Sequence, residues 1–242
     1  MEKTRDLLVI NAVTGLAAVN FLLKTKGTPL ETPTWFYVLT WLISLIMLLF
    51  IQVYHGHPSP TDVTDYDENL RRKHLPWLLG GVIAMLMISS IMVAGYTESS
   101  LYVPRPGAVL STTPLSTESL MDDVLYNFVL VAPAEETLKL MVILSIFLKT
   151  KNLLISVGFP VGVWATFHAY FAYSGPLMPV LVFSAFLSGI VLFLVLKKTG
   201  SLLNAIIAHG SFNTTVIFAS FISVFLIILV FVAIALIVVL KR

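Results

Sequence analysis

The length of its uncharged apolar runs constrains this chain more than any other feature. Residues 201–240 contain no Asp, Glu, Lys or Arg, and several other stretches of about 20 residues are also uncharged. A helix needs about 20 apolar residues to cross the roughly 30 Å hydrocarbon layer of a bilayer. Charged residues make up only 12% of the chain, about half of the roughly 25% usual in soluble domains. We therefore expect an all-α, polytopic integral membrane protein.

Apolar runs bounded by charge, proline or glycine predict eight transmembrane helices. Their expected bounds are residues 7–23, 34–53, 77–96, 121–148, 153–173, 178–196, 201–219 and 222–240. The last two share one uncharged stretch, so we expect a tight turn near residues 220–223. A transmembrane barrel is disfavoured because its strands would appear as alternating segments of about ten residues. No internal repeat is visible and no loop is large enough to form a second domain, so residues 1–242 are expected to form one membrane domain.

The distribution of Lys and Arg predicts the orientation of these helices. Cytoplasmic loops of membrane proteins are enriched in Lys and Arg. If both termini are cytoplasmic, eleven basic residues lie on the cytoplasmic side and three, Lys24, Lys26 and Arg105, on the other. The eleven are Lys3, Arg5, Arg71, Arg72, Lys73, Lys149, Lys151, Lys197, Lys198, Lys241 and Arg242. With seven spans the division would be nine against five, so the sequence favours eight spans with both termini cytoplasmic in the cell membrane.

The remaining basic residue, Lys139, lies inside the fourth predicted span beside Glu135 and Glu136. Ionisable groups within a membrane are costly and usually mark a functional site. Glu135 and Lys139 are four residues apart and should share a helix face, whereas Glu136 should point about 100° away. One lysine cannot balance two acids, which suits one carboxylate to general acid–base work. The alternative is a buried ion pair that only fixes helix packing.

Two later spans carry histidines at helical spacing from another polar or aromatic residue. His209 and Asn213 are four residues apart and should share a face, as should Trp164 and His168. A single histidine in an apolar helix is more often a packing residue. With two such histidines, a binding or catalytic role is as well supported as a packing role. The small-residue pattern of Gly158 and Gly162 predicts close approach of the fifth span to a neighbouring helix.

Three ordered motifs resemble the CPBP family, which comprises the type II CAAX prenyl proteases and bacteriocin-processing intramembrane proteases. They are Glu135-Glu136-Thr-Leu-Lys139, Trp164-Ala-Thr-Phe-His168 and His209-Gly-Ser-Phe-Asn213. The resemblance covers roughly residues 120–220. The family usually has arginine where this chain has Leu140 and phenylalanine where it has Trp164. The Glu-Glu-x-x-Lys form also resembles PrsW-type proteases, whose second motif usually carries an acid in place of His168.

The resemblance implies an intramembrane endopeptidase that cleaves a membrane-associated peptide or protein. In this interpretation Glu135 and His168 activate a water molecule, His209 and Asn213 stabilise the oxyanion, and Glu136 supports them. Lys139 and Trp164 would be supporting residues. A general base and hydrogen-bond donors to the oxyanion are the groups that an acyl-transfer hydrolysis needs.

Several alternatives stay open at the level of sequence. The buried Glu and His residues could form the relay of a proton- or ion-coupled transporter, although no repeated half is present. The chain could also be a non-catalytic membrane scaffold. We expect no cofactor, with zinc held by Glu135, His168 and His209 as the alternative. Cysteine is absent and no basic face is present, so neither thiolate chemistry nor nucleic-acid binding is expected.

Overall fold

The computed structural model describes residues 2–27, 31–56, 63, 74–97, 103–104, 124–174 and 178–217 of the 242-residue chain, and nearly all of them are helical. The helices are α1 (Glu2–Thr25), α2 (Glu31–His55), α3 (His74–Thr97), η3 (Tyr126–Val131), α5 (Ala132–Thr150), α6 (Leu153–Ala172), α7 (Met178–Thr199) and α8 (Leu202–Ile217). Two-residue strands, β1 (Val103–Pro104) and β2 (Tyr173–Ser174), pair antiparallel. The expected all-helical class is confirmed.

Each of the first seven predicted spans overlaps one of these helices, with η3 and α5 together forming the fourth. By length and hydropathy, three of the described helical segments can cross a membrane: Asp6–Thr25, Thr34–His55 and Val182–Thr199. His74–Ile88 and Leu153–Phe167 are shorter apolar segments. The eighth predicted span and the turn near residues 220–223 lie outside the described residues. Eight spans and cytoplasmic termini therefore remain predictions.

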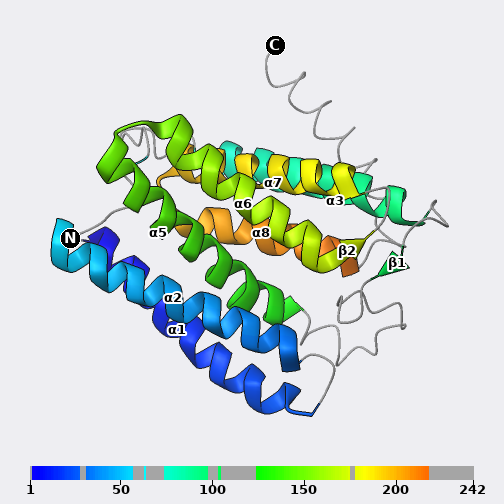
Figure 1. Ribbon diagram of the computed structural model, residues 1–242, viewed down its shortest axis with the longest axis horizontal. Helices are drawn as coiled ribbons and strands as arrows, with labels where there is room; N and C mark the ends of the chain where they lie inside the picture. The colour runs from blue at the N-terminus through cyan, green and yellow to red at the C-terminus, as the bar shows by residue number, and fades with distance from the viewer. Residues whose placement is uncertain are drawn as a thin grey trace.

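If η3 and α5 are taken as one continuous segment, consecutive helices run in opposite directions through the bundle (Figure 1). As a result, the α5–α6 and α7–α8 connections lie at the same end (Figure 1). Lys149 and Lys151 flank the first connection, and Lys197 and Lys198 lie in the last turn of α7 before the second. The charge distribution predicts these four lysines on one side of the membrane, and the fold brings them to one end of the bundle.

Helix α5 occupies the centre of the bundle, between the α1–α2 pair and helices α6 and α8 (Figure 1). It packs against α1, α2, α6 and α8, and its residues from Ala132 to Thr137 are all buried. Leu140, Met141 and Leu144 of α5 join the largest hydrophobic cluster, which also includes residues of α1, α2, α6, α7 and α8. Glu135, Glu136 and Lys139 of α5 therefore face the interior of the bundle, as expected for ionisable groups in an apolar helix.

The outer faces of the helices are strongly apolar. Leu16 of α1, Val53 of α2 and Leu154 of α6 are 75%, 78% and 81% exposed. Soluble proteins rarely expose large contiguous apolar surfaces, whereas lipid tails are as apolar as leucine. These faces suit contact with a bilayer.

A proline accounts for the π-helical turn that precedes α5. Pro133 lies in the first turn of α5, has no N–H, and its ring would clash with the carbonyl of residue 129 in a regular helix. The backbone widens just before it, and the N–H of Ala132 donates to the carbonyl of Asn127, five residues back. Such turns are rare and often occur at functional sites. Here the turn leads directly into Glu135 and Glu136.

The predicted packing role of Gly158 and Gly162 is wrong for the described part of the chain. A Cβ atom added at either glycine would meet no described atom within 4 Å. Both line a shallow groove on the outer face of α6, beside Phe159 and Phe167. The close helix contact is made instead by Gly189 of α7, where an added Cβ would lie 2.6 Å from Val161 Cγ1. The close approach of α6 to a neighbour therefore depends on a glycine of the partner helix.

Candidate active site

Three charged side chains of α5 are buried in the middle of the bundle. Glu135, Glu136 and Lys139 are only 4%, 6% and 7% exposed. Charges at such burial are strongly unfavourable unless they are paired or hydrogen-bonded. The structure of the site therefore depends on the ion pairs and hydrogen bonds that these three side chains make.

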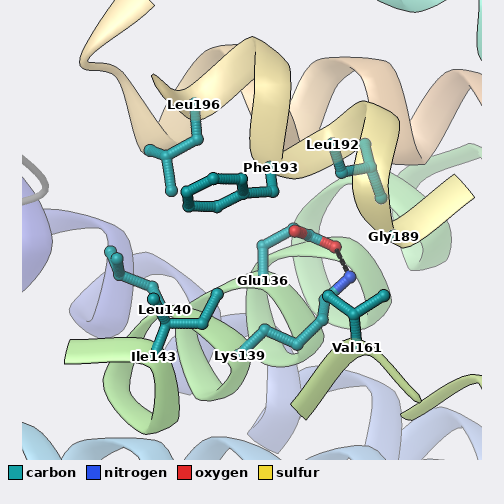
Figure 2. Close-up of a pocket in the computed structure, with 9 residues that line it drawn as sticks. All are labelled: Glu136, Lys139, Leu140, Ile143, Val161, Gly189, Leu192, Phe193 and Leu196. Atoms are coloured by element: carbon teal, nitrogen blue, oxygen red, sulfur yellow. Dashed lines mark ion pairs between the residues drawn. The ribbon is translucent and has the colours of Figure 1, made fainter. Parts of the chain in front are cut away.

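Lys139 forms an ion pair with Glu136 Oε1, one helical turn away at i,i+3 (Figure 2). The sequence spacing places Lys139 on the same helix face as Glu135, but its ion pair in the structure is with Glu136. The pair borders a narrow cavity between α5, α6 and α7 (Figure 2). The rest of its lining is apolar and includes Val161, Leu192 and Phe193.

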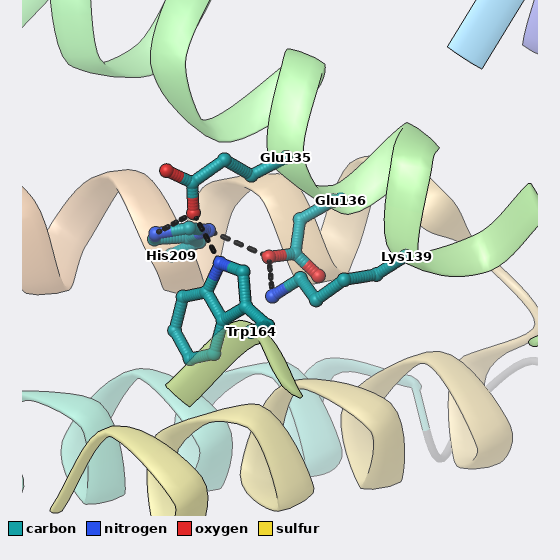
Figure 3. A network of polar contacts seen from close by, with 5 residues as sticks. All are labelled: Glu135, Glu136, Lys139, Trp164 and His209. Atoms are coloured by element: carbon teal, nitrogen blue, oxygen red, sulfur yellow. Dashed lines mark hydrogen bonds and ion pairs between the residues drawn. The ribbon is translucent and has the colours of Figure 1, made fainter. Parts of the chain in front are cut away.

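His209 of α8 lies between the two glutamates (Figure 3). Its Nδ1 is 2.6 Å from Glu136 Oε1, a short hydrogen bond, and its Nε2 is 3.7 Å from Glu135 Oε2. The side chain is fully buried, and its Nε2 has no hydrogen-bond partner among the described residues. Adjacent residues of one helix thus contact opposite nitrogens of a single imidazole. This explains how Glu135 and Glu136 act on one site although they point in different directions from α5.

Trp164 of α6 completes the polar cluster, which we define as Glu135, Glu136, Lys139, Trp164 and His209 (Figure 3). Its indole N–H donates to Glu135 Oε2 at 2.8 Å. The Lys139 ammonium lies 4.0 Å from the centre of the indole ring. The Trp164 and His209 rings meet edge to face, with centroids 6.0 Å apart and an angle of 88° between their planes. Each member of the polar cluster therefore contacts at least two others.

A glycine beside His209 allows α8 to approach the π-helical turn. A Cβ atom added at Gly210 would lie 2.5 Å from a ring carbon of Phe128. Real Cβ contacts are essentially never under 3.0 Å, so any larger residue would force a shift. The glycine after His209 thus has a packing role that sets the distance between α8 and η3. The position of Gly210 in the third motif did not indicate that it packs against Phe128.

Two tyrosines near Glu135 were missed by the sequence analysis. Tyr37 of α2 and Tyr126 of η3 both lie near Glu135. Their rings meet edge to face at 6.0 Å, and the Tyr126 hydroxyl lies 3.3 Å from Thr34 Oγ1. Tyr37 lies in a span without any diagnostic motif, so only the packing of α2 on α5 reveals it.

The remaining predicted site residues, His168 and Asn213, occupy equivalent positions on two helices. His168 lies in α6 one turn after Trp164, but its side chain is outside the described part of the structure. Asn213 lies in α8 one turn after His209 and is half-buried, and its side chain makes no hydrogen bond to the described residues. Helices α6 and α8 run in the same direction (Figure 1), so both positions lie toward the same end of the bundle. The assignment of roles to these two residues remains a prediction.

A metal centre is not formed by the described side chains, among which no group of three His, Cys, Asp or Glu residues is arranged to hold an ion. The alternative zinc ligands are Glu135, His168 and His209, and this set includes a side chain outside that part of the structure. Zinc binding therefore stays a prediction to be tested.

Comparison with known families finds a match, and it covers the segment that carries all three motifs. Residues 117–215 match the family described as type II CAAX prenyl endopeptidase Rce1-like. No match was found among curated proteins or among solved structures. The match begins just before η3 and ends in α8, so it contains every member of the polar cluster. Residues 117–215 are therefore similar to the Rce1-like type II CAAX prenyl endopeptidases, the same family that the three motifs resemble.

Proposed function

We propose that this protein is an intramembrane endopeptidase that hydrolyses a peptide bond of a membrane-associated, CAAX-type substrate. The observation that carries the proposal is the burial of His209 between Glu135 and Glu136. A carboxylate and an imidazole at one buried position supply both the base and the electrophilic donor that acyl-transfer hydrolysis requires. The family match supports the reaction class and the substrate class.

Glu135 is the proposed general base. Its carboxylate faces the unpartnered Nε2 of His209 across 3.7 Å, which is too long for a direct hydrogen bond. Glu136 is committed to Lys139 and to His209 Nδ1, so it is suited to orientation rather than to proton abstraction. His168, one turn beyond Trp164 on α6, would bind and help to activate the same water molecule.

His209 is the proposed electrophilic donor. Because an ionised carboxylate only accepts hydrogen bonds, the contact with Glu136 places a proton on Nδ1. A second proton on Nε2 would give the polar cluster two negative and two positive charges, counting Lys139. The Nε2–H group would then donate to the oxyanion that forms when water attacks the peptide carbonyl.

Asn213 is the proposed second oxyanion donor. It follows His209 by one helical turn, which places both residues on the same side of α8. A neutral amide cannot act as a general base, so its contribution would be hydrogen bonding to the developing negative charge. One such donor is typically worth about 10²–10³ in kcat.

We propose metal-free water activation by Glu135, with zinc on Glu135, His168 and His209 as the alternative. Elemental analysis of active, purified protein distinguishes them. Metal-free activation predicts substoichiometric zinc and full activity after chelation. Stoichiometric zinc, with activity lost on its removal and restored on its return, would favour the zinc alternative.

Reconstitution in liposomes tests the proposed function directly. The probe is a fluorogenic peptide that ends in a farnesylated CAAX sequence, and proton flux is measured on the same vesicles. Wild-type protein is expected to release the C-terminal tripeptide without moving protons. Proton flux without cleavage would instead favour a transporter, and neither activity would favour a scaffold. A second probe, a membrane-anchored peptide without the prenyl group, tests whether prenylation is required.

A further inference from the structure

We propose that the narrow cavity between α5, α6 and α7 binds one water molecule, held by the Lys139 ammonium and the Glu136 carboxylate. The site goes beyond the proposed function, because it concerns a structural water and not the water that attacks the substrate. The described residues that line the cavity include Glu136 and Lys139 but neither Glu135 nor His209. The cavity is therefore separate from the place where Glu135 is proposed to activate water.

The Lys139 ammonium has more hydrogen-bond donors than described partners. An ammonium carries three N–H groups and accepts no hydrogen bond. Its charge is paired with Glu136 Oε1 and it lies 4.0 Å from the centre of the Trp164 ring, yet Nζ has no hydrogen-bond partner among the described residues. The Lys139 side chain is almost fully buried. Because a buried donor without an acceptor is unfavourable, the ammonium requires a further acceptor.

The cavity provides room for that acceptor directly beside the ammonium (Figure 2). About 10 Å³ of it is open to water, close to the roughly 10–15 Å³ that a single water molecule needs. Gly189 lines the cavity and has no side chain to fill it, and Val161 and Leu192 form apolar walls. Among the described side chains of the lining, only Glu136 and Lys139 have polar atoms.

The charges at the cavity favour water over other small ligands. A metal cation would be repelled by the ammonium and an anion by the carboxylate, and an apolar molecule would leave the ammonium donors unpaired. A water molecule accepts from Lys139 Nζ and donates to Glu136. The described contacts of Glu136 with Lys139 and His209 both use Oε1, so Oε2 can receive the water. Two polar partners are within the range that buried waters have.

Val161→Ile tests whether the cavity holds water. Val161 lines the cavity, so the added methylene group takes up its small volume and displaces the water. We expect the unfolding temperature to fall by about 2–4 °C, the shift that the loss of one hydrogen bond gives in a chain of this size. A dry cavity predicts no fall, because filling an apolar void stabilises a protein. An unchanged or higher unfolding temperature would therefore overturn the proposal.

The same substitution in Lys139→Met separates loss of water from overpacking. Without the ammonium the water has lost its donor, so Val161→Ile should now raise the unfolding temperature or leave it unchanged. Equal falls in both backgrounds would mean overpacking alone and would contradict the proposal. Val157→Ile is the matched control, because Val157 lies one turn earlier on α6, belongs to the same hydrophobic cluster and is not among the described residues of the lining. Its effect should be the same in both backgrounds.

A high-resolution crystal structure tests the site in the wild-type protein and does not depend on hydrolysis. It should show one solvent peak about 2.7–3.2 Å from both Lys139 Nζ and a carboxylate oxygen of Glu136. The peak should be missing from Val161→Ile. A wild-type structure that resolves other buried waters but shows no peak in this cavity would overturn the proposal, whatever the protein cleaves.

Discussion

Glu136 Oε1 lies 2.6 Å from Nδ1 of His209, although 73 residues separate them in the sequence. Both side chains are buried, and the same carboxylate is paired with Lys139. Charge-assisted hydrogen bonds of this length are roughly twice as strong as neutral ones. The contact therefore joins α5 to α8 and fixes the orientation of the imidazole.

The Glu136–Lys139 pair should behave as one unit in unfolding experiments. Glu136→Gln leaves a buried ammonium without its anion, and Lys139→Met leaves the two glutamates without their lysine. Breaking one partner of a buried ion pair typically costs about 3–5 kcal/mol. The double variant restores neutrality, so its loss of stability should be smaller than the sum of the two single losses.

Chemical unfolding of purified protein in detergent measures all four members of this cycle. Lys198→Met is the matched control, because Lys198 is exposed and lies 5.6 Å from the centre of the Trp77 ring. Its effect should stay within about 0.5 kcal/mol. Strictly additive losses for Glu136→Gln and Lys139→Met would refute a functional ion pair in the folded protein.

Gly210→Ala should impair both packing and catalysis. The added methyl group would overlap the Phe128 ring and push α8 away from η3, at a cost of about 1–3 kcal/mol. Because His209 is the preceding residue, kcat should fall as well, and Phe128→Leu should partly restore both properties.

Gly158→Ala provides the control for this substitution. Its Cβ would meet no described atom within 4 Å, and alanine is favoured over glycine in a helix by about 1 kcal/mol. Unfolding of the two variants compares the positions directly. Destabilisation by Gly158→Ala exceeding that of Gly210→Ala would mean that the groove on α6 is filled by another segment.

The sequence predicted the polar residues of the site better than their pairing. Uncharged runs of membrane length locate the helices, so Glu135, Glu136 and Lys139 are conspicuous within one of them. Their partners depend on how α5, α6 and α8 rotate against one another. Helical spacing alone puts Lys139 on the face of Glu135, whereas in the structure Trp164 binds Glu135 and Lys139 pairs with Glu136.

The close helix contacts were also hard to predict from sequence, because they too depend on how the helices rotate against one another. A small-residue pattern identifies a helix face that permits close approach but does not show which neighbour uses it. Gly158 and Gly162 line the outer groove, whereas Gly189 and Gly210, neither of which has a second glycine four residues away, make the close contacts. The π-helical turn follows from Pro133, yet many membrane helices contain proline without one.

Asn213 should affect turnover far more than substrate binding. Asn213→Ala removes a donor to the oxyanion, and we expect kcat to fall by about 10²–10³ with a nearly unchanged KM. Asn213→Asp nearly preserves shape but, when ionised, opposes the developing charge, so it should be at least as damaging. If both folded variants retain the wild-type kcat, Asn213 acts only in packing.

The orientation in the membrane is tested by reporter fusions. A reporter at the C-terminus and one inserted in the loop of residues 54–76 should both be found in the cytoplasm, because Lys and Arg are concentrated there. A reporter between residues 97 and 120 should lie on the opposite side. An external C-terminal reporter would mean that the apolar residues 201–240 do not form two spans.

Single-turnover cleavage of the farnesylated CAAX peptide in liposomes tests the central claim most directly. Glu135→Gln and His168→Ala should each abolish cleavage, because each removes a group proposed to activate water, while both proteins retain the wild-type unfolding temperature within a few degrees. The tripeptide released by wild-type protein should be absent from both reactions. Near-normal cleavage by folded Glu135→Gln would contradict the account, because water activation could not then depend on the carboxylate that faces His209.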